Sequence, residues 1–160
     1  MIDFEALGWQ GDTVGELDHR ALKTPSVKLR GAHVGVAGDI VYTVDLRLRR
    51  PNADACLSST ELHSIEHFLL EGFQRLLPQR FVGVGVMGCQ TGFYLTLLGE
   101  GRRAIIERAL EAILEGVLVA EAVPYARVDQ CGHWRHHDLA RAQAVAREVL
   151  AQRAAWRDVA

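Results

Sequence analysis

Three side chains that commonly take part in metal chemistry lie within five residues, in the stretch HSIEH. His63 and His67 are four positions apart, so on a helix both imidazoles lie on the same face and can bind one metal ion. Glu66 is within one turn of both, where its carboxylate can serve as a base or orient a ligand. The HxxEH pattern occurs in one class of zinc enzymes. The alternative interpretation is a polar, solvent-exposed helix edge with no ligand.

A metal site needs a third protein ligand, and a catalytic site keeps a further position open. Cys131, in QCGHWRHHD, is the candidate, because the glycine beside it lets the backbone turn. The imidazoles of His133, His136 and His137 compete for the same role. A loop thiol without a function is the alternative interpretation of Cys131.

A second thiol, Cys89, lies in VMGCQTGFY between Gly88 and Gly92. Beside a metal or another cation, its pKa falls below the ordinary value of about 8.5, which makes a thiolate available near neutral pH. A small buried residue at a hairpin is the alternative interpretation, and a common one for cysteine. Cys56 has no evident partner and is interpreted as structural.

Alternating and helical patterns predict the elements that must position these residues. The stretches VKLRGAHVGV and IVYTVDLRLRR alternate apolar and polar residues around a GVAGD turn, which predicts a hairpin over residues 27–49. FVGVGVMGC and GFYLTLLG predict two further strands. GVGVMG matches the GxGxxG spacing, but a strand-forming stretch follows it in place of the helix that a nucleotide site requires.

Three amphipathic helices are predicted. The first begins at residues 58–60 and ends before Pro78, the second covers residues 102–119, and the third begins near His137 or Asp138. The predicted fold class is α+β: an antiparallel sheet of about four strands with three main helices packed on it. We expect one domain over residues 1–160, with residues 1–12 as a mobile N-terminal arm.

Composition excludes several function classes. The chain has 160 residues, of which 49% are hydrophobic, and a formal net charge of −2. That charge gives no electrostatic case for nucleic acid or an anionic membrane as partner. We predict no membrane span and no signal peptide, and therefore a cytoplasmic protein with reduced thiols.

Six segments in order resemble the S-ribosylhomocysteine lyase family, the LuxS type that makes the precursor of autoinducer-2 in quorum sensing. HSIEH is similar to the family's HTLEH, and MGCQTGFY is similar to its MGC[RQ]TGFY. The other four are LDH (17–19), TPSVKLR (24–30), VDLRLRRPN (44–52) and CGHWRHHDL (131–139). Each motif alone is weak, but six in the same order and at similar spacing are specific.

The resemblance implies a LuxS/metallohydrolase-like fold and a reaction. It implies that His63, His67 and Cys131 bind one divalent metal ion per subunit, iron(II) with zinc or cobalt as substitutes, and that Glu66 and Cys89 are the acid–base pair. The thioether of S-ribosylhomocysteine would be cleaved to homocysteine and 4,5-dihydroxy-2,3-pentanedione by carbonyl migration and β-elimination. Family members are homodimers with two sites at the subunit interface.

The resemblance also implies a substrate-binding shell, and this shell departs from the family's pattern. Its expected members are His19, Lys28, Arg30 and Asp45. The departures are at Val14, Lys28, Gly83 and Gly85, where the family has serine, arginine, aspartate and serine. They motivate an alternative in which a diverged lyase acts on another sugar thioether. Further alternatives are a metallohydrolase that uses Glu66 as base, and a non-catalytic metal-binding protein.

Overall fold

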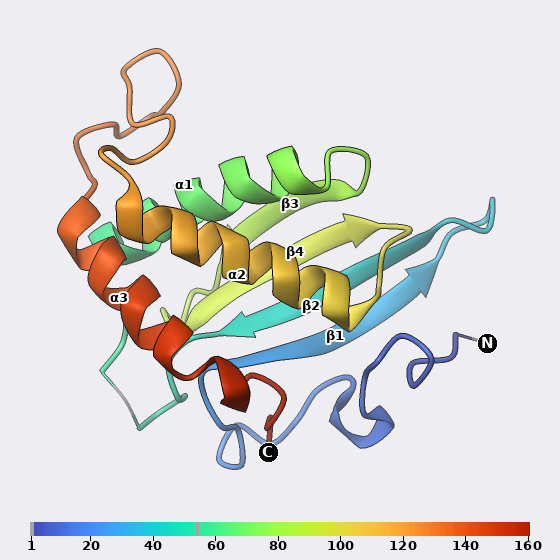
Figure 1. Cartoon of the computed structure of the whole chain (residues 1–160). Helices are drawn as coiled ribbons and strands as arrows, with labels where there is room; N and C mark the ends of the chain where they lie inside the picture. Colours follow the sequence, from blue (N-terminus) through green and yellow to red (C-terminus); the bar gives the residue numbers. More distant parts are fainter. Residues whose placement is uncertain (1, 54) are drawn as a thin grey trace.

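A computed structural model describes residues 2–53 and 55–160 (Figure 1). The predicted α+β class is confirmed within these residues, because three α-helices pack on a four-stranded antiparallel sheet. The strands are β1 (Ser26–Val34), β2 (Ile40–Arg47), β3 (Phe81–Val86) and β4 (Gly92–Leu98). The helices are α1 (Ser59–Leu76), α2 (Arg103–Val119) and α3 (Leu139–Ala151), with short 3-10 turns at Gly11–Thr13 and Arg153–Ala155.

The order of the strands differs from their order in the chain. The sheet runs β1-β2-β4-β3, and every neighbouring pair is antiparallel. The chain leaves β2, passes through α1 and re-enters the sheet at the far edge as β3, and β4 then fills the gap. This crossover matters for function, because it places the turn between β3 and β4 beside the end of β2.

All three helices lie on one face of the sheet (Figure 1), and the core lies between the two layers. Alternate residues of the central strands, such as Val44 and Leu95, point to that face and are fully buried. The two long helices approach each other closely at Gly72 of α1, where a Cβ would lie 2.3 Å from Ile113 of α2.

Local sequence fixes the ends of α1, the helix that carries HSIEH. The Ser58 side chain accepts a hydrogen bond from the Glu61 backbone N–H, and the Glu61 carboxylate accepts one from the Ser58 N–H at 2.6 Å. This reciprocal capping box satisfies helix donors that would otherwise lack partners. The helix ends at Leu76, two residues before Pro78, because the residue before a proline disfavours helical geometry. The predicted bounds of this helix are confirmed.

The N-terminal segment packs against the start of α2. Trp9 is 2% exposed, its indole Nε1–H donates to the Gly101 carbonyl at 2.7 Å, and the Arg103 guanidinium lies 5.1 Å from its ring centre. Residue 1 lies outside the described residues. The mobility expected for residues 1–12 stays a prediction, and the burial of Trp9 sets a free-energy cost for any release of the segment.

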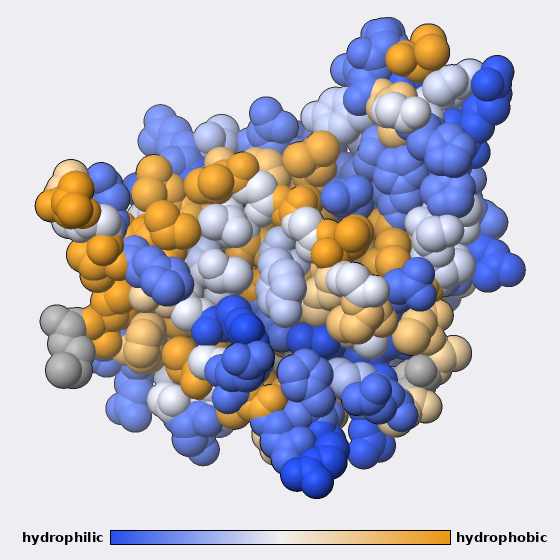
Figure 2. All heavy atoms as spheres, turned by 180° about the vertical axis from the view of Figure 1, so that it is seen from behind, coloured by the Kyte–Doolittle hydropathy of each residue, from blue (hydrophilic) through white to orange (hydrophobic). Residues whose placement is uncertain are grey.

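Part of the sheet face opposite the helices is exposed, although Lys28, Asp45 and Arg47 on that face are buried. Figure 2 shows this face with hydrophobic side chains gathered over much of the sheet and polar groups between them. Leu98 of β4 is an exposed apolar residue on this face, at 38% exposure. Among the described residues, no helix is both long and apolar enough to cross a membrane.

Candidate metal centre and active site

Four potential metal ligands converge where α1 meets the segment that precedes α3. His63 and His67 come from α1, and Cys131 and His137 come from the irregular segment before α3. One ligand atom from each of the four lies within 4.8 Å of those of the others. The helical i, i+4 spacing supplies the first pair, and the loop supplies the second.

Hydrogen bonds fix both helical imidazoles in the form that can bind a metal. His63 Nδ1 lies 2.8 Å from the His136 carbonyl, and His67 Nδ1 lies 2.7 Å from the Pro124 carbonyl. A carbonyl only accepts, so each Nδ1 carries the proton and each Nε2 presents a free lone pair. Backbone carbonyls of this kind are the usual outer partners of metal-binding histidines.

The same side chains fit a divalent ion by type as well as by geometry. The rings of His63 and His67 are 89° apart, and the Cys131 Sγ lies 3.4 Å from His63 Nε2. Two imidazole nitrogens and a thiolate suit iron(II), zinc or cobalt better than magnesium. The cluster can therefore hold such an ion.

His137 is the fourth member, and sequence reasoning raised it only as a competitor for Cys131. Its ring stacks on that of His63, with centroids 4.0 Å apart. Burial, together with the neighbouring imidazoles, lowers the pKa of His137 to about 4, so the ring is neutral at physiological pH. His133 is not a member of this cluster. Its exposed ring stacks on that of His136, with centroids 4.7 Å apart.

A cleft opens beside this cluster, between α1 and the turn that joins β3 to β4. Its lining includes His63 and Glu66 from α1 and Met87, Gly88 and Gln90 from the turn. Cys89 lies between two of these lining residues and is exposed. Glu66, one of the two side chains expected to move protons, thus lines a cleft that reaches His63, and Cys89 belongs to the turn that forms another wall of the cleft.

Close packing against β2 shapes the turn that holds Cys89. Gly92 pairs with Arg47, and a Cβ at Gly92 would lie 2.1 Å from the Leu46 carbonyl oxygen. Only glycine permits that approach. The turn itself is closed by a bond from the Gln90 N–H to the Met87 carbonyl, with Gln90 at φ 60°. Cys89 is therefore held beside the end of β2.

At the end of β2, the Cys89 thiol lies next to a cation. The Arg47 guanidinium lies 3.8 Å from the Cys89 Sγ, and the Thr91 hydroxyl lies 3.0 Å from it. Burial raises the pKa of Cys89, but the hydrogen bonds of Thr91 and the charge of Arg47 outweigh burial, so the net pKa is lowered. The predicted ionisable thiol thus has a physical cause, with a guanidinium as the cation.

Arg47 is a residue of the candidate site that the sequence analysis did not single out. It is 3% exposed, its Nη2 lies 2.7 Å from the Asp45 Oδ2, and its Nη1 donates to the Thr91 hydroxyl at 2.7 Å. Residues two apart on a strand share a face, so the DLR spacing of Asp45 and Arg47 could have indicated the ion pair. The proximity of Cys89, 42 positions away, depends on the sheet order.

Of the four residues expected to bind substrate, Lys28, Arg30 and Asp45 lie near one another on β1 and β2, and His19 lies in the segment before β1. Lys28 pairs with Asp45 across β1 and β2, both are buried, and the Lys28 ammonium donates to the Gly15 carbonyl. Burial lowers the pKa of Lys28, although the charge of Asp45 opposes this. Arg30 contacts Glu16 at 3.0 Å, and His19 is exposed in the preceding segment.

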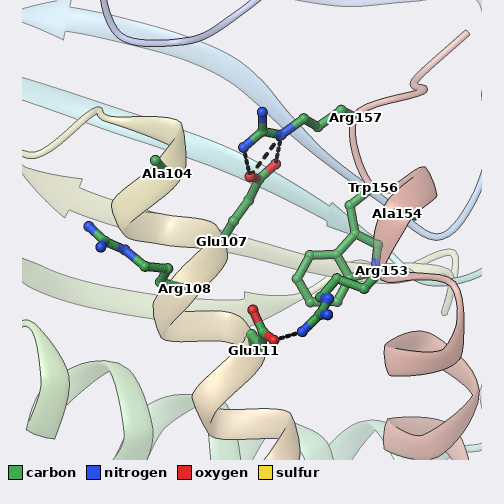
Figure 3. A pocket seen from close by; sticks show the side chains of 8 residues that line it. All are labelled: Ala104, Glu107, Arg108, Glu111, Arg153, Ala154, Trp156 and Arg157. Carbon is green, nitrogen blue, oxygen red and sulfur yellow. Dashed lines mark hydrogen bonds and ion pairs between the residues drawn. The ribbon is translucent and has the colours of Figure 1, made fainter.

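Another hollow lies far from this chemistry, between α2 and the C-terminal segment. Figure 3 shows Glu107 and Glu111 of α2 facing the guanidinium groups of Arg157 and Arg153. Glu107 contacts Arg157 at 2.6 Å, and Glu111 contacts Arg153. Both carboxylates are therefore neutralised by arginines of the C-terminal segment. We interpret these ion pairs as contacts that hold the C-terminal segment on α2.

The fold and the cleft together define a class: an α+β protein with a His-His-Cys cluster that could hold a metal ion, a carboxylate in the adjoining cleft and an ionisable thiol in the β3–β4 turn. Comparison with protein families identifies which one. The S-ribosylhomocysteinase (LuxS) family model matches residues 14–160, and this chain belongs to that family.

Individual relatives agree across most of their length. The S-ribosylhomocysteine lyase of Dichelobacter nodosus is 41% identical over 143 residues, which cover 89% of this chain and 92% of the relative. The enzyme of the same name from Clostridium perfringens is 42% identical over 84% of this chain and 88% of the relative. That of Helicobacter pylori is 39% identical over 89% and 93%. The resemblance identified from the six motifs is confirmed.

Proposed function

We propose that this chain is a metal-dependent S-ribosylhomocysteine lyase that releases homocysteine and 4,5-dihydroxy-2,3-pentanedione. The observation that carries the proposal is the convergence of His63, His67 and Cys131, with both histidine Nε2 lone pairs free. Membership of the family whose relatives bear this name supports the reaction.

We assign the metal to His63, His67 and Cys131, with one ion per subunit and iron(II) as the native metal. A bound divalent ion supplies Lewis acidity, which makes the protons beside a sugar carbonyl easier to remove. The protein's own contribution is to fix the ligand atoms. The carbonyls of His136 and Pro124 hold the two imidazole rings, and α1 sets the spacing between them.

Cys89 and Glu66 are proposed to move the protons. Carbonyl migration along the sugar requires one proton to leave a carbon and another to arrive at its neighbour, twice in succession. The Cys89 thiolate, favoured by Arg47 and Thr91, would serve as one base, and the Glu66 carboxylate on α1 as the other. Once one carbon separates the carbonyl carbon from the carbon that bears the sulfur, loss of a proton from that intervening carbon forms a C=C bond and expels the homocysteine thiolate by β-elimination.

The remaining assignments follow from the same family. We propose that His19, Lys28, Arg30 and Asp45 form the substrate-binding shell, with residues 1–160 acting as a single lyase domain in the cytoplasm. We also propose a homodimer with two sites at its interface. The exposed apolar residues of the open sheet face (Figure 2) support that surface as the interface.

A second candidate, a lyase for another sugar thioether, is favoured by β3. Gly83 and Gly85 leave open space where a Cβ would stand, so this strand offers no side chain there to hold an amino-acid tail. Lys28 is buried against Gly15, and a lysine lacks the bidentate fork of arginine. A panel of ribosyl thioethers separates the candidates, because clear preference for S-ribosylhomocysteine would rule out the second.

The test of the lyase is release of free thiol. Purified protein loaded with iron(II) or cobalt is incubated with S-ribosylhomocysteine. Free thiol is then titrated, and the thiol groups of the protein itself are subtracted from the result. Cys89→Ala and Glu66→Gln should each abolish turnover while the metal stays bound. Cys56→Ala is the matched control and should keep full activity, because Cys56 is exposed and belongs neither to the metal-ligand cluster nor to the β3–β4 turn. Metal binding without thiol release would refute the proposal, and an active Cys89→Ala variant would favour a hydrolase with Glu66 as base.

A further inference from the structure

A buried hydroxyl on α1, that of Ser64, links the helix to the segment that carries Cys131. Ser64, between the two metal-binding turns of α1, has no exposed surface. A buried hydroxyl needs hydrogen-bond partners, and Ser64 has two in the segment that also carries Cys131. The Asp138 N–H lies 2.9 Å from the Ser64 Oγ, and the His137 Nδ1 lies 3.4 Å from it.

The chemistry of these groups sets the direction of each hydrogen bond. A backbone N–H can only donate, so the Ser64 oxygen accepts from Asp138, and its own O–H is left to donate to His137 Nδ1. An Nδ1 that accepts carries no proton, so the ring proton of His137 lies on Nε2. That nitrogen lies 3.7 Å from the Cys131 Sγ, within the range of an N–H donating to sulfur.

His137 is oriented as a partner of the ligands rather than as one of them. Its ring lies 4.0 Å from that of His63 at an interplanar angle of 29°, so the two rings are stacked. An ion bound by an imidazole lies in the ring plane, which stacked rings cannot share. His63 and His67, at 89°, can converge on one ion.

We propose that Ser64 and His137 are positioning residues that hold and tune the Cys131 thiolate, through the chain Asp138 N–H to Ser64, Ser64 O–H to His137, and His137 N–H to sulfur. The inference rests on the proposed metal site. A hydrogen bond to an anionic sulfur is charge-assisted, so it orients the thiolate and stabilises its charge. Groups with this relation to a ligand tune both the affinity and the electronic properties of a metal site.

The test uses cobalt(II), whose absorption reports on the thiolate as well as on binding. His137→Phe keeps a ring stacked on His63 and removes the donor, whereas His137→Gln keeps an N–H within reach of the sulfur. We expect His137→Phe to weaken cobalt binding by about 10- to 100-fold. Its thiolate-to-cobalt charge-transfer band should move to longer wavelength, because a sulfur without a hydrogen bond gives up charge more easily.

His137→Gln should recover most of the affinity and the wild-type band position. Ser64→Ala is a second variant that tests the inference even if His137→Phe fails to fold, because it changes little volume. It removes the hydrogen bond that orients the His137 ring, so it should shift the charge-transfer band in the same direction as His137→Phe. Far-UV circular dichroism and thermal melting verify the fold of each variant.

Several results would overturn the inference. An unchanged band and affinity in both His137→Phe and Ser64→Ala would show that the chain to sulfur has no effect. Altered ligand-field bands in both His137→Phe and His137→Gln, with loss of one nitrogen ligand, would make His137 a ligand. Wild-type protein that fails to bind cobalt would instead remove the metal site, and with it the proposed function.

Discussion

The reactivity of Cys89 depends on Arg47, which touches both the thiol and a buried carboxylate. Arg47 lies 3.8 Å from the Cys89 sulfur, and its ion pair with Asp45 is buried on both sides, at 3% and 2% exposure. The ion pair with Asp45 orients the Arg47 guanidinium, and the positive charge of that guanidinium acts on the Cys89 thiol. Arg47 therefore contributes to catalysis through Cys89 in the proposed reaction.

We predict that Arg47→Gln makes Cys89 harder to ionise. The positive charge of Arg47 lowers the pKa of Cys89, so its loss raises that pKa and shrinks the thiolate fraction at neutral pH. The rate of Cys89 alkylation against pH, measured in a Cys56→Ala background, should shift to higher pH. Arg47→Lys keeps the charge and should shift the profile less.

The same substitution carries a cost in stability. Arg47→Gln removes the ion-pair partner of the buried Asp45 carboxylate and leaves only the neighbouring Lys28 as a cation, and broken buried pairs destabilise proteins by about 3–5 kcal/mol. Alkylation must therefore be measured well below the melting temperature of the variant. A profile that is identical in Arg47→Gln and wild type would contradict the role given to Arg47.

At the scale of elements, the site depends on two supports, helix α1 and the turn between β3 and β4. The helix alone sets the His63–His67 spacing, and its capping box fixes where it begins. The turn is different, because its position depends on the contact of Gly92 with β2. A change at Gly92 should therefore disturb Cys89 while leaving the metal ligands in place.

Gly92→Ala tests this dependence. Its Cβ would meet the Leu46 carbonyl oxygen at 2.1 Å, so we expect a loss of about 1–3 kcal/mol or more in the free energy of unfolding. Thiol release should fall, while cobalt binding to the folded protein persists. Gly116→Ala in α2 is the control: nothing lies within 4 Å of its Cβ position, and alanine should stabilise the helix by about 0.4–1 kcal/mol.

At the scale of the whole molecule, the open face of the sheet is the feature that one chain leaves unexplained. The helices cover only the other face (Figure 1). Tyr94, Thr96 and Leu98 alternate with the buried residues of β4 and so point away from the helices. Apolar surface of this kind is commonly covered by a partner, which here is proposed to be a second copy.

The double variant Thr96→Glu/Leu98→Glu should convert the dimer to a monomer, because charge on both copies would meet in an apolar interface. Light scattering after size-exclusion chromatography measures the mass. Val128→Glu is the control, since Val128 is 77% exposed on the loop before α3, and it should leave the dimer intact. A wild-type monomer at micromolar concentration would refute the dimer, and a dimeric double variant would place the interface elsewhere.

Local patterns determined a large part of this molecule. The hairpin, the three helices and the two later strands were predicted from periodicity, caps and prolines, because each of those signals acts within a few residues. His63, His67 and Glu66 were found for the same reason, since helical spacing alone places them on adjoining positions. The six ordered motifs were enough to identify the family.

Tertiary structure decided what depends on contacts between distant residues. Arg47 reaches Cys89 only because β4 lies between β2 and β3, an order that no local pattern reveals. Among four nearby candidates, Cys131 and His137 face the helical pair because of how the irregular segment folds back on α1. Ser64, which the sequence presents as one more helical residue, acquires its partners only through that packing. Local chemistry specifies the elements, and the packing of remote segments completes the site.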